Sequence, residues 1–372
     1  MSHFYNRLFF EVFSNIANQY EDNYDEQRFG KRRLSWKLKT KKFIRKKLGM
    51  MDYLDYSHHS SFHKLMPYFE GMDQLYDTLA DLSSKSLLVQ LAAYRILGDR
   101  KYKLPLSTPS YWKGIQDIAA LKNEADFLKV KFAGQMIPLY KYDLNTIDIP
   151  MQMYYTGSGI YNHLSIKQYE YLSDEVRIKP EPGDIVLDCG ACWGDTALFF
   201  AGEVGESGHV YSFEFIPDNM DVFNTNTALN PSLKSRITLV PYPLDETSGK
   251  EVSYTDNGPG SRISQQVDST TTASTLCLDD FYEQYRPEKI DFIKMDIEGM
   301  ELPALKGGLS VLKKFRPKLA ISIYHSMDDF TGISKYIDSL DLGYKFYLRH
   351  GTIHNEETVL LAIASDRYEN EK

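Results

Sequence analysis

The stretch Asp188-Cys189-Gly190-Ala191-Cys192-Trp193-Gly194-Asp195 decides the fold of this chain of 372 residues. It follows a short apolar run at 185–187 and precedes a helix-like run at 196–201. A strand that turns at glycines directly into a helix brings backbone N–H groups close to a ligand, because glycine has no Cβ to block the approach. The pattern predicts a strand, a glycine turn and a helix that together hold a nucleotide-like cofactor.

The residues of the turn favour one cofactor over another. Dinucleotide-binding turns read G-x-G-x-x-G and place a pyrophosphate on the helix N-terminus, whereas three residues separate Gly190 from Gly194 and Asp188 ends the strand. A carboxylate repels a pyrophosphate but complements the ammonium and sulfonium of S-adenosylmethionine. We therefore expect S-adenosylmethionine to be bound by Asp188, Gly190, Ala191 and Gly194; the alternative is that Asp188 caps the following helix.

A second acidic residue supports this interpretation. The next apolar run, at 210–213, ends in Glu214, which follows Asp188 by 26 residues. An acidic residue about 20 residues beyond such a turn accepts hydrogen bonds from ribose hydroxyls. The spacing predicts that Glu214 binds the ribose of the cofactor.

Length and composition exclude several classes of protein. The chain is long enough for about two domains. Its net charge of -8 argues against a general nucleic-acid binder. No run approaches the roughly 20 apolar residues of a membrane span, and the apolar run at 8–13 is interrupted by Glu11 and lacks a cleavage site, so we expect no signal peptide. Three cysteines make no disulfide framework, and we expect a cytoplasmic protein.

The hydrophobic periodicity divides the chain into three parts. Residues 1–125 have apolar side chains at helical spacing and predict a helical N-terminal region. Residues 126–164 contain two alternating runs, at 127–132 and 136–140, that predict a hairpin, followed by a connector. Residues 165–372 are expected to form the cofactor-binding domain and to begin with a helix around 165–176.

The N-terminal region contains a strongly basic run from Lys31 to Lys47. One interpretation is a patch for an anionic partner, such as a peripheral membrane surface or a phosphorylated carrier. The other is a solvated helix face paired with the acidic residues just before it, and we favour this one because charge runs mostly lie on the surface.

Apolar runs alternate with helical patterns beyond residue 184. Near-continuous apolar strands separated by helices predict an α/β fold with a doubly wound, mostly parallel sheet. The expected strands are at 185–187, 210–213, 237–240, 290–295, 318–324, 344–348 and 358–363. The last two are close enough to form a hairpin, which would place an antiparallel strand at one edge.

Ligands bind such a sheet at the carboxyl ends of its strands. One predicted strand ends in Lys294-Met295-Asp296-Ile297-Glu298, and the next ends in His325. Lys294 and Asp296 share a face because side chains alternate along a strand. If these two strands are neighbours, Asp296, Glu298 and His325 converge beside the cofactor turn.

Three kinds of chemistry are open to this group. His325 or a carboxylate would take the proton of a hydroxyl nucleophile as its oxygen attacks a methyl group in line. Alternatively, Asp296, Glu298 and His325 would hold a divalent metal that lowers the pKa of the acceptor. In the third, structural case, Lys294 pairs with Asp296 and Glu298 caps the following helix. We prefer the structural role for Lys294 and a direct, catalytic role for Asp296, Glu298 and His325.

These pieces together resemble the FkbM family of S-adenosylmethionine-dependent methyltransferases, from about Tyr155 to the C-terminus. The block from Lys294 to Glu301 is much more specific than the glycine turn. Two departures are Cys192, where the family usually has a small polar residue, and Phe215, which replaces a common proline. The matching pieces are GDIVLDCGA at 183–191, GDT at 194–196, FE at 213–214, LDD at 278–280, KMDIEGME at 294–301 and PKLAISIYH at 317–325.

The resemblance implies a Rossmann-like class I methyltransferase sheet, S-adenosylmethionine as the methyl donor, and usually O-methylation of a sugar or natural-product hydroxyl. It does not extend to residues 1–125. We therefore expect an O-methyltransferase that acts on a sugar, glycan or natural product. The alternatives are a nicotinamide-dependent oxidoreductase, disfavoured by the absence of G-x-G-x-x-G, and a catalytically silent methyltransferase-like scaffold.

Overall fold

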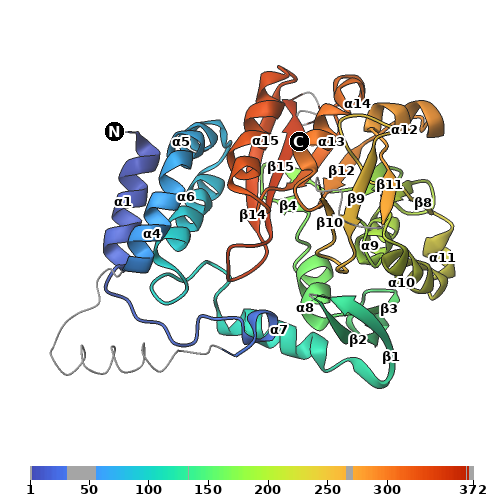
Figure 1. The fold of residues 1–372 in the computed structure, drawn as a ribbon, viewed down its shortest axis with the longest axis horizontal. Coiled ribbons are helices and arrows are strands. Elements are labelled where there is room, and N and C mark those ends of the chain that lie inside the picture. The colour runs from blue at the N-terminus through green and yellow to red at the C-terminus, as the bar shows by residue number, and fades with distance from the viewer. Residues whose placement is uncertain (1, 32–55, 133, 265–270, 366, 368–372) are drawn as a thin grey trace.

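The computed structural model describes residues 2–31, 56–132, 134–264, 271–365 and 367 (Figure 1). Of the basic run from Lys31 to Lys47, all but the first residue lies outside these ranges. Among the described residues, no helix is both long and apolar enough to cross a membrane.

A seven-stranded sheet forms the centre of the molecule, in the order β14-β15-β13-β12-β6-β7-β8. The five strands from β13 to β8 are parallel to one another. Every residue of β12, β13 and β15 is buried, which explains their near-continuous apolar sequence. The strands are β6 (Ile185–Cys189), β7 (His209–Phe213), β8 (Ile237–Val240), β12 (Phe292–Met295), β13 (Lys318–Ser322), β14 (Tyr344–His350) and β15 (Thr358–Ala364). The predicted doubly wound, mostly parallel sheet is confirmed.

The prediction that the antiparallel strand lies at one edge of the sheet is wrong. The hairpin of β14 and β15 forms, but β15 is the antiparallel strand and inserts between β13 and β14. The composition of the two strands gives the reason. β15 is apolar throughout except for Thr358 and suits an interior position, whereas β14 carries Lys345 and Arg349, which suit an edge.

Helices cover both faces of the sheet (Figure 1). Alternate residues of each strand enter two different cores, so that Val186 packs on one face and Leu187 on the other. One face is covered by α12 (Leu278–Tyr285), α13 (Glu301–Lys306), α14 (Leu309–Phe315) and α15 (Met327–Ser339). The other is covered by α9 (Asp195–Val204), α10 (Pro217–Ala228) and α11 (Pro231–Lys234).

The N-terminal region is helical, as expected, and packs against the β14 edge of the sheet. α5 contacts α15, and α6 contacts β14. The hydroxyl of Ser84, in the first turn of α6, accepts a hydrogen bond from the backbone N–H of Leu348 in β14 at 2.9 Å. The N-terminal helices are α1 (His3–Asn15), α2 (Glu26–Phe29), α4 (Tyr56–Leu65), α5 (Phe69–Thr78), α6 (Leu82–Leu97) and α7 (Pro109–Ala119).

In the described part of the chain, two three-stranded sheets accompany the main one, besides a two-stranded pair. The predicted hairpin is present as β1 (Lys122–Phe132) and β2 (Gln135–Asp143), which β3 (Gln152–Tyr155) extends. The other sheet contains β9 (Glu251–Thr255), β10 (Arg262–Ser264) and β11 (Thr272–Ser274).

The helix expected around 165–176 is wrong. Helical structure instead occupies α8 (Gly157–Ile160) and a π-helical turn, η3 (Tyr161–Ser165), and the short strands β4 (Tyr171–Leu172) and β5 (Arg177–Ile178) follow. Thr156 caps α8 by accepting the N–H of Gly159. This helix start was not predicted, because the glycines that follow Thr156 resemble a linker. The hydroxyl of Ser173 accepts the N–H of Val176 at 3.2 Å, which closes a turn in place of a helix.

Candidate active site

The glycine turn after β6 is required by packing between two strand ends. Gly190 has φ 86°, and a Cβ there would lie 2.0 Å from the carbonyl oxygen of Asp296, which follows β12. The backbone N–H groups of Gly190 and Ala191 donate to the carbonyl of Phe213, and that of Gly194 donates to Ala191. These three N–H groups therefore bond within the protein, and the assignment of Gly190, Ala191 and Gly194 to the cofactor stays a prediction.

The carboxylate of Asp188 is paired inside the protein. It is fully buried, accepts the hydroxyl of Thr196 at 2.9 and 3.0 Å, and lies 3.2 Å from Nζ of Lys294. Burial raises the pKa of Asp188, an effect that Lys294 opposes. The expected Lys294–Asp296 pair is thus replaced by a Lys294–Asp188 pair, and Lys294 also donates to the carbonyl of Gly190 at 2.7 Å.

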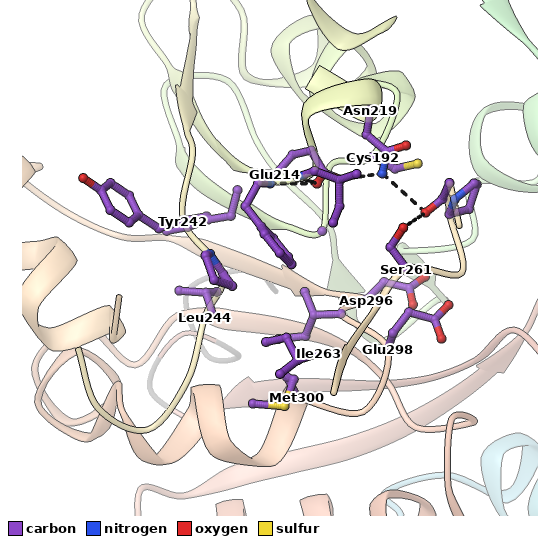
Figure 2. Close-up of a pocket in the computed structure, with 18 residues that line it drawn as sticks. Cys192, Glu214, Asn219, Tyr242, Leu244, Ser261, Ile263, Asp296, Glu298 and Met300 are labelled. Atoms are coloured by element: carbon purple, nitrogen blue, oxygen red, sulfur yellow. Dashed lines mark hydrogen bonds between the residues drawn. The ribbon is translucent and has the colours of Figure 1, made fainter. Parts of the chain in front are cut away.

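A pocket opens beyond the carboxyl ends of β6, β7 and β12 (Figure 2). Figure 2 shows Tyr242 and Leu244 at one end of the pocket, which is apolar, and Asp296 and Glu298 at the other, which is acidic. Its lining comprises Gly190, Cys192, Phe213, Glu214, Phe215, Ile216, Asn219, Tyr242, Pro243, Leu244, Gly258, Pro259, Ser261, Ile263, Asp296, Ile297, Glu298 and Met300. In the described part of the chain, Asp188, Ala191 and Gly194 do not belong to this lining.

Glu214 lies at the end of β7 and lines the pocket, where the sequence predicts the ribose-binding acid. Its Oε1 accepts the backbone N–H groups of Phe215 and Ile216, both at 2.7 Å, and Oε2 accepts Nδ2 of Asn219 at 3.2 Å. Burial raises the pKa of Glu214 to about 7, against the opposing effect of these donors. The carboxylate is fixed in place and faces the pocket.

The structure brings Asp296, Glu298 and His325 together, as the order of strand ends suggests. Nε2 of His325 lies 3.2 Å from Oδ1 of Asp296 and 3.8 Å from Oε1 of Glu298. Asp296 also accepts the hydroxyl of Tyr169 at 2.7 Å and that of Tyr324 at 3.2 Å. These donors hold Asp296 at the pocket wall.

Glu301 also belongs to the group of Asp296, Glu298 and His325, and its role was not predicted from the sequence. It is fully buried, and its two carboxylate oxygens accept the backbone N–H groups of Ile297 and Gly299 at 2.8 and 2.9 Å. Its Oε1 also lies 2.9 Å from Nδ1 of His325. Within the described ranges, no side chain caps α13 at Met300; Glu301, the first residue of that helix, instead holds the loop before it, and its position in the KMDIEGME block was the available signal.

The surroundings of His325 keep it protonated at neutral pH. Burial by itself lowers the pKa of an imidazole, but the carboxylates of Asp296 and Glu301 outweigh that effect and raise the pKa of His325 to about 11. His325 in turn holds the pKa of Asp296 well below its usual range, despite burial. An imidazolium donates protons and does not accept them, so a carboxylate is the better candidate for a base.

Glu298 has the properties of such a base. Burial raises the pKa of Glu298 above its ordinary value, although His325 and Arg262 act in the opposite direction. Its side chain is 19% exposed, lines the pocket and lies 2.8 Å from Nε of Arg262. Its backbone has φ 56°, a conformation that is costly for a residue with a Cβ and is concentrated at functional sites.

Among the described residues, Asp296, Glu301 and His325 have ligand atoms close enough to hold one metal ion. This set contains Glu301 where the sequence predicted Glu298. A metal requires free carboxylate oxygens, whereas both oxygens of Glu301 accept backbone N–H groups. The three residues fit a buried ion triad better than a metal site.

A second pair of a histidine and a carboxylate, His163 and Asp195, lies near this group and was not predicted from the sequence. Nδ1 of His163, in η3, lies 2.5 Å from Oδ2 of Asp195, the first residue of α9. The ring of His163 also packs 5.8 Å from that of Tyr169, the residue that donates to Asp296. His163 and Asp195 are 32 positions apart, so no local sequence pattern predicts that they pair.

Comparison with known proteins identifies one domain of the chain. The family model for the methyltransferase FkbM domain matches residues 188–346, from the end of β6 into β14. The crystal structure of methyltransferase FkbM from Methylobacillus flagellatus KT is 19% identical with a TM-score of 0.51, over 88% of this chain and 71% of that one. No curated protein matches the chain in sequence.

Two further solved structures are more distant. Fibrillarin from Aeropyrum pernix, in complex with natively bound S-adenosyl-L-methionine, is 14% identical with a TM-score of 0.35, over 66% of this chain and 86% of that one. An O-methyltransferase from Bacillus cereus, in complex with SAH, is 14% identical with a TM-score of 0.33, over 56% and 80%. The strand order, the pocket at the strand ends and the match over residues 188–346 lead to one conclusion: this chain contains a methyltransferase FkbM domain, an S-adenosylmethionine-dependent methyltransferase domain with a Rossmann-like sheet.

Proposed function

We propose that this methyltransferase methylates a hydroxyl oxygen of a sugar, glycan or natural product. The observation that carries the proposal is Glu298, a pocket-lining carboxylate with a raised pKa at the acidic end of the pocket. A sugar hydroxyl is a weak nucleophile at neutral pH and needs a base to take its proton. Three unpaired cysteines are compatible with the reducing cytoplasm, where we propose the enzyme acts.

The cofactor-side residues fit S-adenosylmethionine, which supplies an electrophilic methyl group when it is bound. Glu214 faces the pocket with a fixed carboxylate that suits two ribose hydroxyls. Tyr242 and Leu244 form an apolar end that suits the adenine ring (Figure 2). Asp188 contributes indirectly, since its pairing with Lys294 holds the carbonyl of Gly190 in place.

At the acidic end of the pocket, Glu298, Asp296 and His325 have different roles toward the acceptor. Glu298 accepts the hydrogen bond of the acceptor hydroxyl and then its proton. Asp296, held by Tyr169 and Tyr324, orients the acceptor. His325, between Asp296 and Glu301, supplies the positive charge that keeps these buried carboxylates ionised.

A calorimetric titration tests the cofactor assignment at Glu214. Glu214→Ala removes hydrogen bonds to a charged group and should weaken S-adenosylmethionine binding by about 1.5–3 kcal/mol. The exposed Glu251, on β9, offers a matched control in Glu251→Ala. Unchanged affinity would remove Glu214 from the site, and preferential binding of a nicotinamide cofactor by the native chain would favour an oxidoreductase instead.

His325→Ala tests whether the ion triad acts on the acceptor side. The triad does not touch Glu214, so S-adenosylmethionine affinity should stay nearly unchanged. Methyl transfer should fall by up to about 10²–10⁴-fold, the contribution of a positioned base, because Asp296 and Glu298 lose the charge that keeps them ionised and in place. Chelators should have no effect on the native enzyme. Loss of activity on chelation, with recovery in magnesium or manganese, would favour a metal at Asp296, Glu301 and His325.

The acidic net charge predicts that nucleic acid is not the acceptor. The chain carries a net charge of -8, which opposes binding to a polyanion. Filter binding of DNA and RNA oligonucleotides should detect no tight complex. Submicromolar binding that weakens steeply with salt would contradict this expectation.

A further inference from the structure

The side chain of Asn219 joins three elements that surround the pocket. It lies in the first turns of α10 and is 2% exposed. Its Oδ1 accepts Nε1 of Trp193, in the glycine turn, at 3.0 Å, and its Nδ2 donates to Oε2 of Glu214 at 3.2 Å and to the carbonyl of Gly258 at 3.4 Å. A neutral amide combines one acceptor with two donors, and this site uses all of them.

Gly258 belongs to a segment, residues 257–263, that we call the strap. The strap follows β9 and includes the first two residues of β10. It is folded on itself: the hydroxyl of Ser261 donates to the carbonyl of Gly258 at 2.6 Å and accepts the N–H of Asn257 at 2.9 Å. Gly258 has φ 62°, and a Cβ there would lie 2.6 Å from the carbonyl oxygen of Lys131. The strap is thus seated closely against the tip of the β1–β2 hairpin.

The strap also reaches the acidic end of the pocket. Its residues Gly258, Pro259, Ser261 and Ile263 line the pocket (Figure 2). Arg262 donates through Nε to Oε2 of Glu298 at 2.8 Å. A continuous set of contacts therefore runs from the carboxylate of Glu214, through Asn219 and the strap, to the carboxylate of Glu298.

We propose that Asn219 is a positioning residue that couples cofactor binding at Glu214 to seating of the strap over the pocket. The inference rests on the proposed function, because it takes Glu214 as the ribose-binding carboxylate and Glu298 as the acceptor-side base. Ribose hydroxyls on Glu214 would reinforce the position in which Asn219 already donates to both the carboxylate and Gly258. The seated strap excludes water from the pocket and places Arg262 on Glu298, so the acceptor meets an oriented carboxylate after the cofactor has bound.

Hydrogen–deuterium exchange of the strap amides, measured by mass spectrometry without any acceptor, tests this coupling. In the native chain, saturating S-adenosylmethionine should slow exchange of residues 257–263 by about fivefold or more, within the usual range of coupling between sites. Asn219→Ala should weaken cofactor affinity about tenfold, as expected for hydrogen bonds to a charged group. At saturating cofactor, this variant should leave strap exchange at its cofactor-free rate.

Two further variants separate coupling from simple loss of structure. Asn224, exposed on the same helix, provides the control Asn224→Ala, which should retain both affinity and strap protection. Asn219→Asp keeps an acceptor for Trp193 and loses both donors, so it should lose protection even if Asn219→Ala fails to fold. Circular dichroism confirms that each variant is folded.

The experiments separate a failure of the proposed coupling from a failure of the proposed cofactor site. Full strap protection in cofactor-saturated Asn219→Ala or Asn219→Asp would overturn the coupling while leaving the cofactor site intact. Strap exchange in the native chain that does not respond to bound S-adenosylmethionine would also overturn it. Failure of the native chain to bind S-adenosylmethionine would instead overturn the cofactor assignment, and the coupling with it.

Discussion

Glu298→Gln should lower the rate of methyl transfer by about 10²–10⁴-fold, the contribution expected of a positioned general base. Glutamine keeps the size of the side chain and an oxygen for Arg262, but it cannot take a proton from the acceptor. S-adenosylmethionine affinity should stay nearly unchanged, because Glu214 is not altered. Single-turnover kinetics and calorimetry measure the two quantities separately, and the exposed Glu251→Gln is the matched control.

The pH dependence of the native enzyme provides an independent check on Glu298. Burial raises the pKa of Glu298 above its ordinary value of 4.5, and only the ionised carboxylate accepts a proton. The rate should therefore fall as the pH is lowered through this raised pKa, and Glu298→Gln should lack that acid limb. Full turnover by the variant, or an acid limb that it retains, would exclude Glu298 as the base.

Lys294→Met should destabilise the fold by about 3–5 kcal/mol, the usual cost of removing one partner of a buried ion pair. The change leaves Asp188 fully buried without the cation that lies 3.2 Å away, and it removes the donor to the carbonyl of Gly190. Urea unfolding at neutral pH measures the effect. The double variant Lys294→Met with Asp188→Asn should recover much of the loss, because no unpaired charge remains.

The loss of stability in Lys294→Met shows whether the ion pair between Lys294 and Asp188 stabilises the fold. A loss within about 0.5 kcal/mol, which is typical of surface substitutions, would show that Asp188 finds another partner or takes up a proton at little cost. Equal losses in the single and double variants would show that packing of the lysine stem, and not its charge, accounts for the effect.

The sequence predicted those parts of the fold that depend on local pattern. Apolar runs such as 318–322 identify buried parallel strands, and the glycines at 190 and 194 mark the turn into α9. The position of β15 was not predicted, because strand order depends on pairing between segments distant in the chain. The helix expected at 165–176 failed because Thr156 and Ser173 direct the local structure through side-chain hydrogen bonds.

The location of the acidic group was predictable, but its charge states were not. Asp296 and His325 converge because β12 and β13 are adjacent parallel strands. Alternation along one strand grouped Lys294 with Asp296, yet Asp188 lies directly opposite Lys294 in the register of β12 with β6 and takes its place. The high pKa of His325 depends on Glu301 as well as Asp296, a contact that only the folded chain reveals.

The most direct test of O-methylation is mass spectrometry of the reaction products. The native enzyme is incubated with S-adenosylmethionine carrying a deuterated methyl group and a panel of sugars, glycans and hydroxylated natural products, with Glu298→Gln in parallel. We predict a labelled methyl ether on an acceptor oxygen with the native enzyme and a loss of about 10²–10⁴-fold in its rate of formation with the variant. Label on nitrogen or carbon, or equal product from both proteins, would contradict it.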